Sequence, residues 1–505
     1  MVLKPNILLI TTDQQHWNTI GAFNSEILTP NIDRLVKEGT TFSRAYCPNP
    51  TCTPSRASII TGKYPSQHGA WSIGTKLSED EPTLGKELIS NGYTTSLIGK
   101  AHFQPLQSSD EFPSLESYPI LQDLDYWKNF NQCFYGFNHV ELARNHVNEP
   151  HVGQHYAIWM EEKGCGNWRD YFLPPTGTMD PAQEYTWPIP EKFHYNTWIA
   201  ERTNEKLKEY KDHEEPFFLW SSFFDPHLPY LVPEPWDKMY DPDKLTIPSL
   251  KEGEHDLNPP HFQKTQENEA DFSEYRETEF GNIGFHSHSN ITEDQKKKDM
   301  AVYYGMISML DKYVGKILDQ IEELGLRENT IVVFTSDHGH LFGQHGLHDK
   351  GGFHYEDLLK IPFLVRYPGV VPENKVSASL QSLVDLAPTL LSLTKSDHYH
   401  MKMSGVDQSE VWKGENSDAR DHIICEFRKQ PTRVHQKTFV NDRYKITVYY
   451  NQNYGELFDL EEDPNEWENL WDDDDYQGLK KELLLRFLWG ELGKEILPMP
   501  RIAGA

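Results

Sequence analysis

The sequence predicts an α/β protein with a large central sheet, followed by a smaller α+β region. Short apolar runs without polar alternation recur along most of the chain, and helical patterns separate them. Such runs are typical of strands covered on both faces, and their alternation with helices is typical of α/β folds. Around residues 395–420 the apolar density falls, and a half-exposed strand pattern follows. We therefore expect one unit over residues 1–395 and a smaller unit with an antiparallel sheet over residues 396–505.

Strands are expected where several apolar or β-branched residues stand together between polar or glycine-containing segments. The first such run, residues 6–11, reads Asn-Ile-Leu-Leu-Ile-Thr. Residues 443–450 alternate in polarity, as expected of an antiparallel strand with one exposed face. The other expected strands are residues 40–46, 94–98, 217–224, 330–335 and 361–365.

Helices are expected where capping signals precede apolar residues spaced by three or four positions. Thr29 and Pro30 are typical of an N-cap and the first residue of a helix, and this helix would end at Gly39. Thr292 opens a long helix that has apolar residues at helical spacing and ends at Gly325. Shorter helical patterns cover residues 57–61, 83–90 and 476–492.

Two stretches match neither pattern. Residues 104–195 and 233–290 are rich in Pro, Asn, Trp, Tyr and His and show no clear periodicity. Segments of this length without secondary structure are uncommon in compact proteins and are usually functional. We expect both to be insertions that lie over the site.

The charge balance narrows the range of partners. The chain has 77 Asp and Glu against 48 Lys and Arg, and its net charge is −29. A field of this sign opposes broad binding to nucleic acid or to an anionic membrane, so we expect neither partner. A small anionic substrate is compatible with this field only where cations and a metal ion outweigh it locally.

The cysteines and the N-terminal residues indicate the compartment. Five unevenly spaced cysteines do not form the pattern of a disulfide framework and favour a reducing environment. The apolar run from Ile7 to Ile10 is too short for the core of a signal peptide, and no window reaches the length of a membrane span. We therefore expect a cytoplasmic protein.

Residues 52–56 read Cys-Thr-Pro-Ser-Arg and stand directly before a short helical pattern. A single cysteine in such a place is usually structural or mildly reactive. The five residues, however, resemble the C-x-P-S-R signature of the sulfatase family, and residues 61–69 resemble the segment that follows it there. The resemblance implies an alkaline phosphatase-like sandwich with a large mixed central sheet. It also implies that a formylglycine-generating enzyme converts Cys52 to formylglycine, whose hydrate is the nucleophile, and that Arg56 holds this nucleophile in place.

Two pairs of polar residues follow strands that are far apart in the sequence. Asp13 and Gln14 come directly after the first expected strand, and Asp337 and His338 come directly after residues 330–335. Ligands of open α/β sheets collect at the carboxyl ends of strands. The four residues resemble the sulfatase metal site, although that family more often has a second Asp in place of Gln14 and an Asn in place of His338. Oxygen-rich coordination favours Ca²⁺, and the imidazole leaves Mn²⁺, Mg²⁺ or Zn²⁺ open.

Isolated basic residues also stand near the ends of expected strands. Lys100 and His102 follow one strand, His227 follows another, and Lys350 lies farther along the chain. Taken singly, each would be interpreted as a solvated or a core side chain. The resemblance assigns Lys350 and His227 to the leaving oxygen, Lys100 to the sulfate, and His102 to the second hydroxyl of the nucleophile. Together with the arginine of the signature and the metal ion, they would neutralise the charge that develops in sulfate transfer.

Candidate substrate contacts come from two further segments. The histidine-rich segment that contains His345 and His354 does not have the spacing of a closed zinc site. We interpret it as a loop over the pocket, in which these two histidines contact the substrate. Arg428, with aromatic and basic residues such as Trp71 and His435, is a further candidate for the surface that binds a sugar.

The sequence thus predicts a sulfatase that hydrolyses a sulfate ester to an alcohol and inorganic sulfate. A sulfated carbohydrate is the first candidate substrate and an aryl sulfate the second. A phosphonate monoester or phosphodiester hydrolase of the same superfamily is an alternative, because the two metal-site pairs are similar to that branch. Lys100 and His102 favour sulfate, since that branch tends to have Tyr and Thr at these places. A non-catalytic glycan-binding protein on this fold is a second alternative, although every expected catalytic position is filled.

Overall fold

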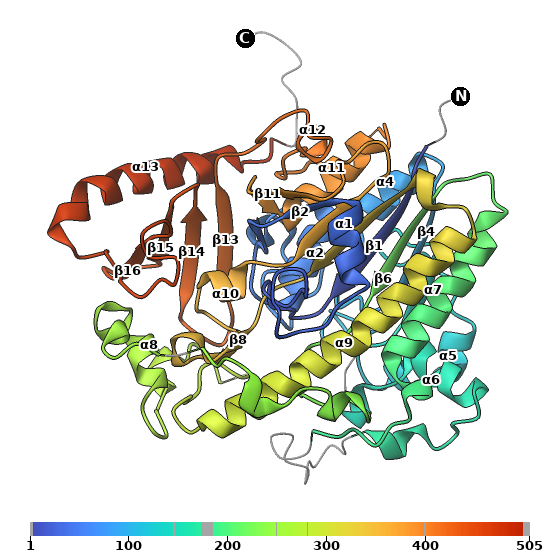
Figure 1. Ribbon diagram of the computed structural model, residues 1–505, viewed down its shortest axis with the longest axis horizontal. Coiled ribbons are helices and arrows are strands. Elements are labelled where there is room, and N and C mark those ends of the chain that lie inside the picture. Colours follow the sequence, from blue (N-terminus) through green and yellow to red (C-terminus); the bar gives the residue numbers. More distant parts are fainter. Residues whose placement is uncertain are drawn as a thin grey trace.

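The computed structural model describes residues 4–144, 147–172, 185–248, 250–279, 281–397 and 400–497. Within these residues the chain forms a mixed eight-stranded sheet and a separate four-stranded antiparallel sheet, with helices packed on both (Figure 1). The predicted fold class is therefore confirmed. In this part of the chain no helix is both long and apolar enough to cross a membrane.

The large sheet has the strand order β11-β2-β10-β7-β1-β6-β4-β5. Strand β1 is parallel to its neighbours β6 and β7, and β4 is parallel to β5 and β6, whereas β10 is antiparallel to β7 and β2. The carboxyl ends of β1, β4, β6 and β7 therefore meet at one edge of the sheet. The strands are β1 (Asn6–Thr12), β2 (Thr40–Phe42), β4 (Thr94–Gly99), β5 (His139–Leu142), β6 (Phe217–Ser222), β7 (Thr330–Ser336), β10 (Phe363–Arg366) and β11 (Lys375–Ser377).

Strand β1 shows why the sheet is covered on both faces. Ile7 and Leu9 point into one apolar cluster, Leu8 and Ile10 point into another, and all four are fully buried. Burial of one such side chain contributes about 1.5–3 kcal/mol. The first cluster includes residues of α2 (Cys52–Thr61), α4 (Leu84–Ser90) and α11 (Leu386–Leu393). The second includes residues of α1 (Ile32–Glu38), α7 (Tyr195–Lys211) and α9 (Glu293–Glu323), of which the last two pack side by side (Figure 1).

The small sheet has the order β13-β14-β15-β16, and helix α13 packs on one face through Leu483 and Phe487 (Figure 1). Strand β13 is nearest to the large sheet, and the Glu426 backbone N–H donates to the Pro48 carbonyl at 2.8 Å. The small sheet thus reaches the loop that precedes α2. Its elements are β13 (Ile423–Arg428), β14 (His435–Val440), β15 (Tyr444–Tyr449), β16 (Gly455–Asp459) and α13 (Gln477–Gly493).

The remaining strands and α-helices are short. The strands form two small pairs, β3 with β12 and β8 with β9. These elements are β3 (Ala45–Tyr46), β8 (Leu341–Phe342), β9 (His348–Asp349), β12 (Gln381–Ser382), α3 (Pro65–His68), α5 (Leu124–Lys128), α6 (Gln154–Glu162), α8 (Pro260–Thr265), α10 (Glu356–Leu359) and α12 (Ser409–Trp412).

Two elements near the N-terminus differ from the prediction. Helix α1 begins at Ile32, because the Thr29 hydroxyl accepts from the Gly21 N–H at 2.7 Å and donates to Asp33 at 3.0 Å instead of capping the helix. The expected strand of residues 40–46 is divided in two. Its first part, β2, pairs with β10 and β11 in the large sheet, and its second part, β3, pairs with β12.

Regular structure also occurs where the sequence showed no periodicity. Residues 104–195 include the edge strand β5 and helix α6, while residues 173–184 of this stretch lie outside the described residues. Helix α7, which has 17 residues, begins at the end of the same stretch and was not predicted. Trp198, Ile199 and Leu207 are buried on it, but most of its positions are polar. The apolar face was too narrow to give a periodic signal.

Candidate active site

Cys52 is the first residue of helix α2, which is buried along its whole length. The sequence pattern predicts this helix only from residue 57. It begins five residues earlier because Pro54 is compatible with the first helical turn, where a backbone N–H has no partner in the helix. The helix ends at Gly62, whose left-handed backbone (φ 64°) stops it. The thiol therefore lies at a buried helix N-terminus.

The strand ends bring the predicted residues to this thiol. Asp13 follows β1, and its Oδ1 is 3.5 Å from the Cys52 Sγ. His338 follows β7, and its Nε2 is 3.3 Å from the same sulfur. The Nζ atoms of Lys350 and Lys100 lie 3.4 Å and 3.8 Å away. Two cations, a carboxylate and an imidazole thus surround one sulfur atom.

Arg56 fixes the strand ends relative to one another. Its Nε donates to the Asp337 Oδ2 at 2.8 Å, and its Nη1 donates to the Lys100 carbonyl at 2.9 Å and to the Ser222 hydroxyl at 2.7 Å. Its Nη2 is 3.7 Å from the Asp13 carboxylate, and the side chain is fully buried. Because a guanidinium offers several donors in one plane, a single side chain can hold the ends of β4, β6 and β7.

Asp13, Cys52, Asp337 and His338 each offer one ligand atom, and these four atoms lie within 4.8 Å of one another. All four residues are buried. His338 donates from Nδ1 to the Gly339 carbonyl at 3.0 Å, which leaves Nε2 directed at the group. Two carboxylates and an imidazole form a donor set that suits a divalent cation, so these residues fit the metal site that the sequence predicted.

Gln14 lies beside this group, and its side chain contacts other residues. Its Oε1 accepts from the Lys350 Nζ at 2.8 Å, and its Nε2 donates to the Asp349 carboxylate at 2.6 Å and lies 2.7 Å from the His340 Nδ1. Its backbone is left-handed (φ 65°), and its N–H donates to the Asp337 Oδ1 at 3.0 Å. In this arrangement Gln14 positions Lys350 and Asp337.

The predicted basic residues form two sets of contacts around Cys52. The Lys350 Nζ lies 2.9 Å from the His227 Nε2, and the His227 Nδ1 lies 2.6 Å from the Leu228 carbonyl. On the other side of the sulfur, the Lys100 ammonium donates to the Asp13 carboxylate. The structure therefore brings Lys100 and Lys350 to Cys52 from two directions, and His227 contacts Lys350.

The charges around the sulfur shift several pKa values. Burial raises the pKa of the Cys52 thiol, but Lys100, Lys350 and His338 outweigh burial and hold it well below its usual value. For Asp13, burial and Cys52 act upward, and Lys100, His227 and Arg56 outweigh them, so the pKa is about 2. Both groups thus favour their anionic forms at neutral pH.

His102 has the properties of a neutral base. Both of its ring nitrogens are buried, and the imidazole lies beside the Cys52 thiol. Burial, and next to it the charge of Arg144, hold its pKa well below the usual value, whereas the charge of Cys52 acts in the opposite direction. An unprotonated imidazole near the thiol is able to accept a proton.

Three predicted substrate contacts lie outside the Cys52 group. His345 is paired with Glu254 at 2.8 Å and stacks on Tyr355 with ring centroids 3.5 Å apart. The His354 Nδ1 lies 2.6 Å from the Thr438 hydroxyl, and the side chain is fully buried. Arg428 is exposed on β13, and its guanidinium lies 5.2 Å from the centre of a Trp71 ring.

Sequence reasoning missed two charged residues near the site. Arg144 follows the edge strand β5 and is buried next to Glu116, with its Nε 3.2 Å from the Glu116 Oε2. Its position after a strand is the signal that found Lys100, but β5 itself was not recognised. Asp349 stands next to Lys350 in the sequence and accepts from the Gln14 amide at 2.6 Å.

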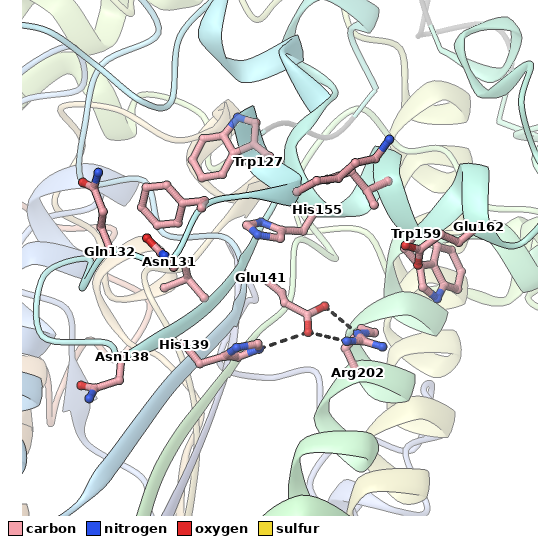
Figure 2. Close-up of a pocket in the computed structure, with 14 residues that line it drawn as sticks. Trp127, Asn131, Gln132, Asn138, His139, Glu141, His155, Trp159, Glu162 and Arg202 are labelled. Atoms are coloured by element: carbon pink, nitrogen blue, oxygen red, sulfur yellow. Dashed lines mark hydrogen bonds and ion pairs between the residues drawn. The ribbon is translucent and has the colours of Figure 1, made fainter. Parts of the chain in front are cut away.

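A separate pocket of about 420 Å³ lies along β5, and Figure 2 shows its lining residues. Glu141 at its centre accepts from the Arg202 Nε at 2.7 Å and Nη2 at 2.8 Å, and lies 3.1 Å from the His139 Nε2. These charged groups compensate one another, and none of the predicted site residues lines the pocket.

Two family models match the chain. The model described as Sulfatase matches residues 5–396, and the model described as N-sulphoglucosamine sulphohydrolase, C-terminal, matches residues 343–489. The chain is 28% identical over 488 residues to an arylsulfatase of Clostridium perfringens, with 94% of this chain and 92% of that protein covered. It is 25% identical over 519 residues to an N-acetylglucosamine-6-O-sulfatase of Bacteroides thetaiotaomicron, with 95% and 85% covered.

A solved structure supports the fold. The crystal structure of a phosphonate monoester hydrolase of Agrobacterium radiobacter superposes with a TM-score of 0.79 and covers 97% of this chain and 96% of its own. The two sequences are 23% identical. At this identity the likeness extends to the architecture, and the chemistry has to be argued from the residues of the site.

Proposed function

This chain belongs to the sulfatase family of hydrolases, and from that premise we propose that it cleaves the sulfate ester of a sulfated carbohydrate with a nucleophile made from Cys52. One observation carries the proposal: Asp13, His338, Lys100 and Lys350 all lie within 3.8 Å of the Cys52 sulfur. An anionic ester and its attacking group both need such an arrangement of cations next to a metal-binding group.

In this proposal the position of the Cys52 sulfur represents the attacking oxygen of a hydrated formylglycine. A divalent cation held by Asp13, Asp337 and His338 would polarise the sulfate and favour the ionised nucleophile. Ca²⁺ is our first candidate for this cation, and Mn²⁺, Mg²⁺ and Zn²⁺ remain alternatives. The formylglycine requires a maturation enzyme as a partner.

The remaining residues have separate roles in the proposed reaction. Lys100 would bind a sulfate oxygen from the side of β4. Arg56 would hold the ends of the strands at fixed positions throughout the reaction. Lys350, held by His227 and Gln14, would donate to the oxygen of the leaving alcohol. His102, which is buried and neutral, would accept a proton from the second hydroxyl of residue 52, so that sulfate is expelled and the aldehyde is regenerated.

The carbohydrate part of the proposal is supported by two printed names among the matches. The second family model is described by a sulfated glucosamine substrate, and one relative is named as an N-acetylglucosamine-6-O-sulfatase. A phosphonate monoester is the second candidate substrate, since the fold is shared with such a hydrolase. Lys100 and His102 favour sulfate over phosphonate, because the phosphonate branch tends to have Tyr and Thr at these places.

The first test is mass spectrometry of the tryptic peptide of residues 45–56, from protein co-expressed with a formylglycine-generating enzyme. This peptide contains both Cys47 and Cys52, so Cys47 is an internal control. We expect the mass change from thiol to aldehyde at Cys52 alone. An unmodified Cys52 in protein that nevertheless hydrolyses sulfate esters would contradict the proposed nucleophile.

The second test compares an aryl sulfate with an aryl phosphonate monoester. We expect a higher kcat/KM for the sulfate, and we expect Cys52→Ala to abolish turnover while Cys47→Ala retains it. Cys47 is a suitable control because it is also buried, and its sulfur contacts the Leu358 carbonyl at 3.8 Å. A higher rate with the phosphonate would favour the second candidate, and no turnover of either ester by matured protein would leave a glycan-binding role.

A further inference from the structure

A small pocket of about 250 Å³ lies where strands β13 and β14 meet the loops on either side of α2. It is smaller than the roughly 300–1,000 Å³ pockets that hold drug-sized ligands, so it has room for about one ring. Its lining is partly aromatic and partly basic. The lining residues that matter here are Asn49, Trp71, Phe427, Arg428, His435 and Lys437.

Two contacts connect the lining of this pocket to chain segments that carry residues of the site. Asn49 stands three positions before Cys52, where its Nδ2 donates to the Glu426 carbonyl at 2.6 Å and its Oδ1 accepts from Thr51 at 2.5 Å. Phe427 packs on Gly352, so closely that a Cβ there would lie 3.0 Å from its ring. Gly352 is two positions after Lys350 in the sequence.

The pocket has an excess of positive charge. The Glu426 carboxylate is compensated, because it accepts from the Ser66 N–H at 2.8 Å and pairs with Lys494 at 2.5 Å and Lys437 at 3.2 Å. Arg428 lies over Trp71 and forms no ion pair with a described residue. Burial, followed by the charges of Arg428 and Lys437, lowers the pKa of His435, which is consistent with positive surroundings. An exposed guanidinium without a carboxylate partner is available to an anion.

We propose that this pocket binds a second anionic group, a carboxylate or a sulfate, on the sugar ring next to the one whose ester is cleaved. The inference rests on the proposed function and narrows its substrate to a carbohydrate of at least two units. Trp71 and Phe427 supply apolar surface for the ring, and Arg428 supplies paired donors for the anion. The pocket is too small for a folded partner, and its lining includes Asn49, which stands three positions before Cys52.

The experiment compares wild type with Arg428→Gln on three sulfated disaccharides that differ in the second ring. This ring carries a carboxylate, a sulfate or no charge. We expect the preference for the charged over the uncharged disaccharide, as a ratio of kcat/KM, to fall about 10- to 100-fold in the variant, the range for hydrogen bonds to charged groups. The first two substrates identify which anion is preferred.

Two further variants separate a specific role from a general one. Arg428→Lys keeps the charge but not the paired donors, so we expect it to restore part of the preference. Arg433→Gln is the matched control, because Arg433 is also exposed near β14, and its Nε donates to the Arg276 carbonyl outside the pocket. We expect this control to keep the wild-type ratio. An unchanged ratio in Arg428→Gln, or an equal fall in Arg433→Gln, would overturn the proposal.

A binding measurement keeps the inference testable if no ester is hydrolysed. In Cys52→Ala protein, calorimetry with the doubly charged disaccharides is expected to give a Kd about 10- to 100-fold lower than in Cys52→Ala, Arg428→Gln protein. If matured wild-type protein hydrolyses no sulfate ester but this difference in Kd is found, the proposed function is rejected and the pocket is not. Equal Kd values for the two proteins would reject the pocket.

Discussion

Substitution of Lys350 by Met should slow the hydrolysis of alkyl sulfates far more than that of aryl sulfates. The Lys350 Nζ lies 3.4 Å from the Cys52 sulfur and 2.9 Å from the His227 Nε2. At 3.4 Å, two unit charges interact by about 5 kcal/mol at an effective dielectric constant of about 20. Part of this interaction energy is offset, because Lys350 also donates a hydrogen bond to Gln14 at 2.8 Å. That hydrogen bond must break before the ammonium group can reach a leaving oxygen.

The remaining effect depends on the leaving group. An alkyl or sugar alkoxide needs a proton, and removal of a general acid typically costs about 10²- to 10⁴-fold in rate. A para-nitrophenolate leaves without one, so we expect a loss of about tenfold or less, which is roughly one hydrogen bond to a charged group. The assay is kcat/KM for a sugar sulfate and for para-nitrophenyl sulfate. Lys360→Met is the control, since this half-buried lysine lies over the Trp17 ring at 4.0 Å. Equal losses with both esters would refute the role of Lys350 at the leaving oxygen.

Three other predictions concern stability and the metal site. Burial raises the pKa of Glu456 from 4.5 to about 7. Between these pH values the folded protein binds more protons than the unfolded protein, so the free energy of unfolding falls by about 3 kcal/mol as the pH rises. Urea unfolding should therefore show that the stability of Glu456→Gln relative to wild type is higher at about pH 8.5 than at about pH 5. An equal difference between the two proteins at both pH values would disprove this. Gly305→Ala should destabilise by about 1–3 kcal/mol, because its Cβ would lie 2.1 Å from a backbone oxygen. Gly478→Ala, also in a helix but with nothing within 4 Å of its Cβ, should keep or slightly raise the Tm, and a Tm that does not fall in Gly305→Ala would be inconsistent with this packing. Chelation should lower both the sulfatase rate and the Tm, because Asp13 and Asp337 lose their cation, and Ca²⁺ should restore both; no change in either quantity would argue against the metal site.

Residues at strand ends could be predicted from the sequence because two local signals coincide there. A buried strand pattern locates the end of the strand, and parallel pairing brings such ends to one edge of a sheet. Asp13, Lys100 and Asp337 each follow a strand that the sequence identified, and the structure gathers them around Cys52 and Arg56. No knowledge of the tertiary contacts was needed for this step.

Residues whose partners come from distant loops could not be predicted in the same way. Gln14 is predicted as a metal ligand from its place after β1, and this role stays a prediction. Its left-handed backbone directs the side chain to Asp349, a residue 335 positions away, and to Lys350. His354 was expected at the substrate, but it is buried against Thr438 of the small sheet. Such choices depend on how the two sheets pack, which no local pattern contains.

Secondary structure was missed where the burial of an element depends on its neighbours. The run of residues 40–46 contains Thr, Phe and Tyr, which favour strands, and its local pattern cannot show that the chain changes partner strands within it. Helix α7 buries Trp198 and Leu207 but is otherwise mainly polar, so its stability comes from packing against α9 and β6. Tertiary contacts, rather than intrinsic propensity, decide such elements.

The contacts of Arg56 have a consequence for the order of events during biosynthesis. Its partners Lys100, Ser222 and Asp337 are 44, 166 and 281 positions away in the chain. The chamber around Cys52 therefore cannot close until the ribosome has passed residue 337 and β7 has docked. Once it has closed, Cys52 is only 2% exposed. A modifying enzyme would have to reach this thiol in the interval between its emergence and the docking of β7, so the timing of translation, rather than recognition of the finished protein, would set the yield of modified chains.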